Sequence, residues 1–405
     1  MSAPIDALPA ARSAVPRLTN LCLGLSQLVC WGISFYMIGA LGDDIVADTG
    51  WSGTLVYGGF SAALVVMGLC SPLIGRIIDR QGGRPVMVGG SILIAVGCVD
   101  LALAYNRAVY LAGWVVLGVA MRMTLYDAAF AALARIAGPD ARRVISQITL
   151  LGGLASTAFW PIGHFLAERF GWRGALLLYA VIAVLTVPLH LSIPPARYVA
   201  PKTVRSGGGG QAITADGGRL LASTLYALIV TLVAFLNSGF SAHIIGILTG
   251  LGLTPAVAVW TASLRGIGQT SARICEILFG RRLHPLMLGV IATGILAAGF
   301  AAGLLSGRNA AAAIAFALLF GIGNGLVTIV RGTLPLVLFE HHVYGALVGR
   351  LLVPSFFLSA FGPVAYALLI ARFGDYAALV LSLAIGAIVL GAAILLRLRF
   401  RAPAR

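Results

Sequence analysis

The sequence predicts an all-α polytopic membrane protein with twelve transmembrane helices. Its 405 residues are 60% hydrophobic and only 10% charged, whereas soluble domains carry about 25% charged residues. The mean hydropathy is +0.99, and each apolar run is about as long as a helix that crosses a bilayer. Arginines gather in alternate connections between these runs, a pattern typical of membrane topology.

Each apolar run is interpreted as a helix, because backbone inside a bilayer must satisfy its own hydrogen bonds. The first six expected spans are Thr19–Leu41, Thr54–Gly75, Pro85–Ala104, Ala108–Ile136, Val144–Ala167 and Gly174–Ile193. The other six are Leu220–Leu248, Pro255–Phe279, Pro285–Leu305, Ala310–Leu338, Leu351–Ala371 and Tyr376–Leu396. The five cysteines lie in these runs without a CxxC pair, which indicates small buried side chains.

Basic residues follow every second span, at Arg76, Arg80, Arg84, Arg135, Arg142, Arg143, Arg197, Lys202, Arg205, Arg219, Arg281, Arg282, Arg397, Arg399, Arg401 and Arg405. The intervening connections hold Asp43, Asp44, Asp48, Glu168 and Asp375. Because basic loops remain in the cytoplasm, both termini are expected there. We expect a multi-pass protein of the cell membrane, the inner membrane of a bacterium. Topology accounts for the net charge of +15, so no nucleic-acid partner is expected.

The predicted topology divides the chain into five parts. They are a cytoplasmic tail at 1–18, a six-helix bundle at 19–193, a cytoplasmic linker at 194–219, a second six-helix bundle at 220–396 and a cytoplasmic tail at 397–405. The linker contains the run Gly207–Gly210 and three prolines, so a flexible connection is expected rather than a domain. The run Met1–Arg17 lacks the apolar core of a signal peptide, and no cleaved signal is expected.

The two bundles have related sequences. The segment Glu168–Leu176 (ERFGWRGAL) matches Ala371–Leu379 (ARFGDYAAL), which lies 203 residues later. The same separation aligns Gly118 with Gly321. These matches predict two six-helix pseudo-repeats.

One connection, Gly75–Arg84 (GRIIDRQGGR), carries a distinctive pattern. An Asp-Arg pair lies among Gly75, Gly82 and Gly83, and glycines permit a tight reversal and close helix approach. The pattern resembles the loop between helices 2 and 3 in the major facilitator superfamily of secondary transporters, with one extra glycine before the last arginine.

This resemblance implies the major facilitator fold, with a substrate path between the two bundles. It also implies that spans 1, 4, 7 and 10 line the path. Six residues are expected to act in gating: Gly75, Asp79, Arg80, Gly83, Arg84 and Arg331. We call Gly75–Arg84 the hinge. We expect its charges to hold together the cytoplasmic helix ends of one half and to favour the outward-facing state.

Ionisable residues inside the expected spans are candidates for function, because each costs a few kcal/mol at mid-membrane. Arg122 and Arg265 lie midway along spans 4 and 8, and a guanidinium can hold a carboxylate through two hydrogen bonds. Both are expected to bind substrate. The alternative is that each pairs with a neighbouring acid and only joins helices. Asp127 is expected to couple protons, or else to form an ion pair. Arg273 and Glu276 are expected to pair with each other.

Polar and aromatic side chains in the spans complete the expected substrate site. They are Tyr126, Gln269, Asn324, Trp31, Gln27, Tyr57 and His243. Metal-binding side chains do not converge in the pattern, so neither a metal site nor a cofactor is expected. The chain contains no nucleophile–base motif, so an enzyme is not expected.

The sequence Gly50–Ser52 (GWS) and the arginine of span 8 partly resemble the monocarboxylate and oxalate:formate branch of the superfamily. The chain departs from this branch in span 1, because its one lysine is Lys202, and at Thr261, where an aspartate is common. The resemblance implies a monomeric secondary active transporter of a small organic anion, with protons as a coupling partner. One alternative is a proton-driven exporter of drugs or metabolites. Another is a membrane sensor that moves no solute.

Overall fold

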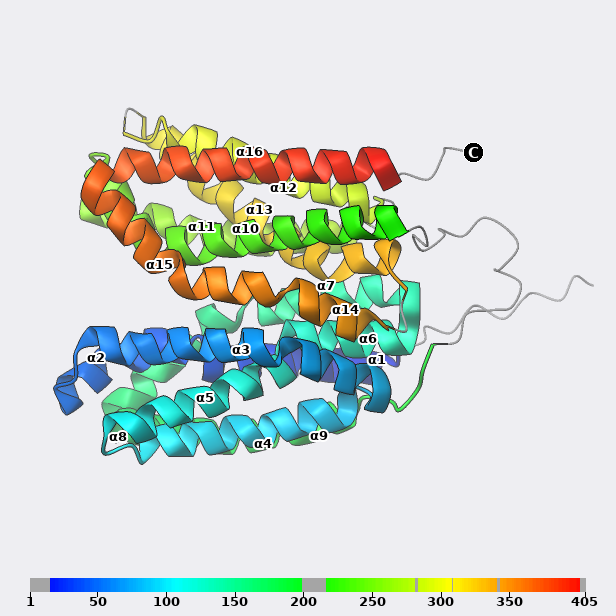
Figure 1. Cartoon of the computed structure of the whole chain (residues 1–405). Helices are drawn as coiled ribbons and strands as arrows, with labels where there is room; N and C mark the ends of the chain where they lie inside the picture. Colours follow the sequence, from blue (N-terminus) through cyan, green and yellow to red (C-terminus); the bar gives the residue numbers. More distant parts are fainter. Residues whose placement is uncertain (1–14, 199–215, 281–282, 308, 341–342, 401–405) are drawn as a thin grey trace, which may run out of the picture.

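The computed structural model describes residues 15–198, 216–280, 283–307, 309–340 and 343–400. All regular elements in these ranges are helices. Figure 1 shows them packed lengthwise in two groups, one from the first half of the chain and one from the second. Parts of the predicted tails and linker lie outside the described residues, at 1–14, 199–215 and 401–405. The same applies to Lys202, Arg205, Arg281, Arg282, Arg401 and Arg405.

The first half, residues 17–191, contains eleven elements. They are α1 (Arg17–Cys30), the π-helical turn η1 (Trp31–Phe35), α2 (Met37–Thr49), α3 (Gly53–Gln81), α4 (Gly83–Ala102), α5 (Arg107–Thr124), α6 (Tyr126–Ala137), the 3₁₀ turn η2 (Gly138–Asp140), α7 (Ala141–Gly152), α8 (Ala155–Leu185) and α9 (Val187–Leu191).

The second half contains longer uninterrupted helices. They are α10 (Asp216–Gly250), α11 (Pro255–Phe279), α12 (Pro285–Gly303), α13 (Ala310–Leu338), α14 (Tyr344–Leu351), α15 (Val353–Phe373) and α16 (Asp375–Phe400). The bounds of α11 and α13 are those predicted from the sequence, since both helices begin and end at changes in polarity.

By length and hydropathy alone, nine helical stretches of the described chain could cross a membrane. One of them, Arg107–Leu191, has 85 residues, which is about three bilayer crossings. The chain reverses within it at η2 and at Gly171, whose φ of 67° is not helical. The helix α11 is not among the nine; it carries Arg265, Arg273 and Glu276 together with several uncharged polar residues. With these divisions the helices agree with the predicted twelve-helix fold.

Several spans are interrupted, and the exposed backbone groups find partners. The fourth span breaks at Leu125, whose backbone is extended between α5 and α6. The break frees the carbonyl group of Thr124, and the side-chain amide of Gln27 donates a hydrogen bond to it over 2.8 Å. Backbone groups at this depth have no water to bind. The amide of Gln27 therefore stabilises the break.

The pseudo-repeat predicted from the sequence is present in the backbone. Gly171 and Gly374, which the sequence match aligns, both have positive φ, at 67° and 81°. Asn106 and Asn309 have the same separation, and each caps the helix that follows it. Equivalent turns thus join equivalent helices in the two halves.

The aligned glycines Gly118 and Gly321 also have equivalent contacts. A Cβ on Gly118 would overlap the backbone of Ala63 in α3, and one on Gly321 would overlap the backbone of Arg265 in α11. In each half, therefore, glycine permits span 4 of the repeat to lie against span 2.

The start of α1, the start of α10 and the end of α16 lie at the same end of the bundle, on the right of Figure 1. We call this the basic end, because Arg76, Arg80, Arg135, Arg142 and Arg143 belong to it. The opposite end holds the acidic connections that follow α2 and precede α16.

The halves contact each other mainly near the basic end. Helix α3 contacts α14 and α15, while α6 and α7 contact α11, α13 and α14. The short helices α6, α7 and α14 all lie toward the basic end in Figure 1. This end of the bundle is therefore the closed one.

This arrangement predicts the outcome of topology mapping. Reporters inserted in the Pro194–Gly218 region and after Arg405 should both give a cytoplasmic signal, because both join the basic end. A reporter inserted at Asn106, at the opposite end, is the matched control and should give the external signal. External signals at the first two sites would show that the protein has the opposite orientation in the membrane.

Candidate functional site

Arg265 lies midway along α11 in a polar cluster of the second half. Its Nη2 donates a hydrogen bond to Oδ1 of Asn237 on α10 over 2.5 Å. The same oxygen accepts a hydrogen bond from Nδ2 of Asn324 on α13 over 2.9 Å. The guanidinium also lies over the ring of Phe320, 4.9 Å from its centroid. Three helices thus position this cation.

The cluster has no acidic partner among the described residues. The ion pairs among the described residues are Arg142–Glu276, Arg173–Asp48 and Arg331–Asp127, and none of them includes Arg265. Nε of Arg265 is buried without a hydrogen-bond partner. The cluster therefore carries a net positive charge.

A wall of aromatic side chains from the first half faces this cluster. Trp31 begins the π-helical turn η1, and its ring lies 4.8 to 5.9 Å from those of Phe35, Tyr126 and Tyr36. The phenol of Tyr36 is close enough to α11 to interact electrostatically with both Arg265 and Arg273. Single π-helical turns are frequent at functional sites. The site is thus formed by both halves.

Arg122, the other arginine expected to bind substrate, lies elsewhere. It is buried between α5 and α3. Its Nε donates to Oγ of Ser71 over 2.8 Å, and its Nη2 donates to the backbone carbonyl oxygen of Ser71 over 3.3 Å. Its charged neighbours are Asp127 and Arg331. The structure does not bring Arg122 and Arg265 into one site.

Asp127 and Arg331 form a bidentate ion pair between the halves. Nε and Nη2 of Arg331 on α13 donate to the two carboxylate oxygens of Asp127 on α6, over 2.9 and 2.8 Å. Their side chains are 11% and 22% exposed, so water screens the pair little. Asp127, which is expected to couple protons, and Arg331, which is expected to act in gating, are thus in direct contact.

Asp79 forms a second contact between the halves. Its carboxylate accepts hydrogen bonds from the backbone N–H groups of Gly345 and Ala346, over 2.9 and 2.7 Å. These groups lie in the first turn of α14, where the helix dipole favours an anion. A Cβ on Gly75 would overlap the backbone of Gly345, so the close approach requires glycine.

The hinge only partly follows the expectation that it joins helix ends of one half. Arg84 does join two helix ends of the first half, since its Nε donates to the carbonyl of Ile193 over 2.6 Å. Gly83 also does so, because it lies tightly against Ala132 of α6. The backbone of Arg80 accepts a hydrogen bond from Arg135. The carboxylate of Asp79 also crosses to the second half.

Arg142 forms a third contact between the halves. Its Nη2 lies 3.4 Å from Oε1 of Glu276 and donates to the carbonyl oxygen of Gly280, while its Nη1 donates to that of Leu283. The predicted pair between Arg273 and Glu276 is wrong, because Glu276 binds Arg142. No role beyond topology was expected for Arg142, since in a basic loop it resembles any topology signal.

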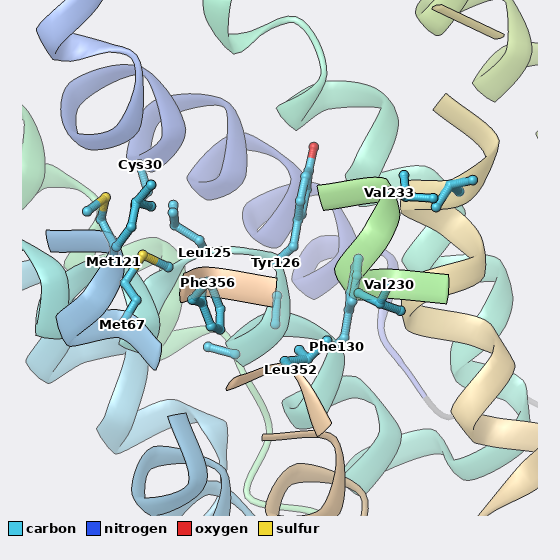
Figure 2. Close-up of a cluster of buried hydrophobic side chains, with 14 of the residues drawn as sticks. Cys30, Met67, Met121, Leu125, Tyr126, Phe130, Val230, Val233, Leu352 and Phe356 are labelled. Carbon is cyan, nitrogen blue, oxygen red and sulfur yellow. The ribbon is translucent and has the colours of Figure 1, made fainter. Parts of the chain in front are cut away.

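Apolar side chains of both halves also pack against one another. Figure 2 shows Leu125, Tyr126 and Phe130 lying between side chains of both halves. Those of the first half are Cys30, Met67 and Met121, and those of the second are Val230, Val233, Leu352 and Phe356. Phe130 also packs so closely on Gly332 that a Cβ there would overlap its ring.

The remaining predicted site residues divide into two groups. Gln27 and Tyr126 are buried near the break in the fourth span, where the Tyr126 hydroxyl donates to the carbonyl of Thr149 over 3.1 Å. Gln269 lies one turn from Arg265 on α11. Tyr57 instead binds Asp43 near the opposite end, and Nε2 of His243 binds the carbonyl of Pro363.

Asn237 is central to the cluster but was not predicted. The available signal was an amide side chain within the apolar run Leu220–Leu248. An amide there needs hydrogen-bond partners. The sequence did not show that these partners are Arg265 and Asn324.

Comparison with known proteins gives a family match over most of the chain. The family model described as Major Facilitator Superfamily matches residues 23–349. The multidrug resistance protein MdtL of Escherichia coli O81 is 30% identical over 167 residues, which are 40% of this chain and 41% of that protein. Monocarboxylate transporter 13 of Bos taurus is 26% identical over 248 residues, 59% of this chain and 56% of that one. The matches thus span 41% of MdtL and 56% of monocarboxylate transporter 13.

Solved structures match along nearly the whole chain. The proton:xylose symporter XylE has a TM-score of 0.73 at 14% identity, covering 95% of both chains. The human organic anion transporter MFSD10 has a TM-score of 0.69 at 17% identity, covering 93% of this chain and 99% of that one. Identities this low show a shared fold alone.

Replacing Asp79 should loosen the basic end. Asp79→Asn removes the charge that accepts two backbone hydrogen bonds, each worth about 1.5 to 3 kcal/mol when charge-assisted. In a variant without native cysteines, Ile145→Cys reports on opening, because Ile145 packs on Gly332 of the other half. Maleimide applied from the basic end should label it several-fold faster in Asp79→Asn. The exposed Asp44→Asn is the matched control, and equal labelling rates in the two variants would contradict the role of Asp79.

The Asp127–Arg331 pair predicts strong coupling in a double-mutant cycle. Asp127→Asn or Arg331→Gln alone should lower the free energy of unfolding in mixed micelles by about 2 to 3 kcal/mol, because each leaves a buried charge unpaired. The double variant should recover much of this loss. The exposed pair Asp48–Arg173 is the control and should couple by less than about 1 kcal/mol. Additive losses at Asp127 and Arg331 would show that the pair is not coupled.

Proposed function

The chain belongs to the major facilitator superfamily, and we propose that it is a secondary active transporter that moves a small organic anion by alternating access. The observation that carries this proposal is the charge of Arg265, which no described acid neutralises. Arg265 is half-buried, and a cation at bilayer depth without an acidic partner is costly. An anionic substrate supplies the missing partner.

The surroundings of Arg265 suit a carboxylate. Asn237 holds one end of the guanidinium and Phe320 supports its face, while Nε remains without a protein partner. A planar guanidinium with free donors binds a carboxylate bidentately. Because Tyr36 of the first half also faces this charge, a bound anion contacts both halves.

In the proposed cycle the structure corresponds to a state closed at the basic end. The contacts of Asp79, Asp127 and Arg142 hold the halves together there. Opening this end separates Arg331 from Asp127 and leaves both charges in need of partners. Asp127 then binds a proton or the nearby Arg122, which links protonation to transport. We propose further that the protein acts as a monomer in the cell membrane, with the basic end and both termini in the cytoplasm.

The second candidate function is a proton-driven exporter of drugs or metabolites. The aromatic wall around Trp31 and Tyr126 favours it, because aromatic faces bind many lipophilic molecules. Partial similarity to the multidrug resistance protein MdtL supports it as well. This function needs Asp127 as the proton carrier but does not need the charge of Arg265.

Substitution of Arg265 distinguishes the two functions. We expect small carboxylates, screened by thermal shift on the purified protein, to raise its melting temperature, because a ligand of the native state stabilises it. Arg265→Ala should abolish this shift. Arg265→Lys should weaken binding about tenfold to hundredfold, since an ammonium lacks the planar fork.

Arg372→Ala provides the matched control, because Arg372 is exposed at the opposite end. It should bind carboxylates as the wild type does. Equal carboxylate binding by Arg265→Ala and wild type would overturn the organic-anion proposal. Stabilisation by lipophilic cations but by no carboxylate would favour the exporter.

A further inference from the structure

A second arginine of α11 is buried without a partner. Arg273 is only 2% exposed, and its Nε and Nη1 have no hydrogen-bond partner. It belongs to none of the ion pairs found among the described residues. The nearest acid along the helix, Glu276, is held by Arg142. Since a buried guanidinium without an acid is unfavourable, this one also needs an anion.

Arg273 reaches across the interface between the halves. A Cβ on Gly153, between α7 and α8, would overlap Nη1 of Arg273. The guanidinium therefore occupies the space that the glycine leaves open. A Cβ on the neighbouring Gly152 would overlap the hydroxyl group of Tyr126. Arg273 therefore lies beside the aromatic wall.

The spacing of the two arginines defines the length of a ligand. Arg265, Gln269 and Arg273 follow one another at intervals of four residues and so share one face of α11. The Cα atoms of the two arginines are about 12 Å apart along the helix at ~1.5 Å per residue. Neither guanidinium has an acidic partner among the described residues, so one elongated molecule with an anionic group at each end would neutralise both.

We propose that this site takes an elongated dicarboxylate, with one carboxylate on Arg265 and the other on Arg273. A monocarboxylate neutralises only one of the two guanidinium groups. The carbon chain between the carboxylates would lie along Gln269 and the aromatic wall. Nε1 of Trp31 is also buried without a partner and can donate to the ligand. This inference rests on the proposed function and narrows its substrate class.

The test compares succinate, glutarate and adipate with butyrate, pentanoate and hexanoate by calorimetry on the purified full-length protein. The wild type should bind the best dicarboxylate at least about tenfold more tightly than the monocarboxylate of equal length, since a second charge-assisted pair is formed. Arg273→Gln should remove this preference, because only one of the two cations then remains. Arg372→Gln is the matched control and should retain the preference.

A second variant keeps the test decisive if Arg273→Gln does not fold. Gly153→Ala retains the charge of Arg273 but displaces its guanidinium, and Gly153 has an ordinary helical backbone. It should also lose the preference for dicarboxylates. A wild type that binds both series equally, or a preference that survives in these variants, would overturn the dicarboxylate inference and leave the proposed function standing. A wild type that binds neither series would overturn both.

Discussion

The structure depends on one constraint, which is that a charge at bilayer depth needs a partner. Three acids, Asp79, Asp127 and Glu276, lie where the halves meet, and each is engaged by a group of the other half. These contacts use the acids nearest to the interface. Arg265 and Arg273 are thereby left positive. The same shortage of acids thus joins the halves at the basic end and leaves two arginines of α11 without an acidic partner among the described residues.

The contacts between the halves differ in how easily they can separate. Asp79 binds two backbone N–H groups at a helix terminus, which water can also solvate once the end opens. Asp127 and Arg331 form a more buried pair, so their separation leaves two charges with a large desolvation penalty. Arg122 lies beside this pair without an acid of its own.

Breaks and glycines in the helices make this arrangement possible. The break at Leu125 separates α5 from α6, so Asp127 need not follow the helical face of Arg122. The amide of Gln27 satisfies the carbonyl of Thr124 that the break exposes. Gly75 and Gly153 admit a backbone or a guanidinium of the other half where any side chain would collide. Departures from regular helix thus lie close to the charged contacts.

The sequence by itself determined the helical class, the pseudo-repeat and the bounds of helices such as α11 and α13. These features follow from hydropathy and turn residues, which act over a few neighbouring positions. Only the tertiary structure decided which charges meet. Asp127 binds Arg331 at a separation of 204 residues, Glu276 binds Arg142 rather than Arg273, and Arg122 binds Ser71. Spacing along one helix shows which residues share a face, but the partner across an interface depends on how the two halves pack.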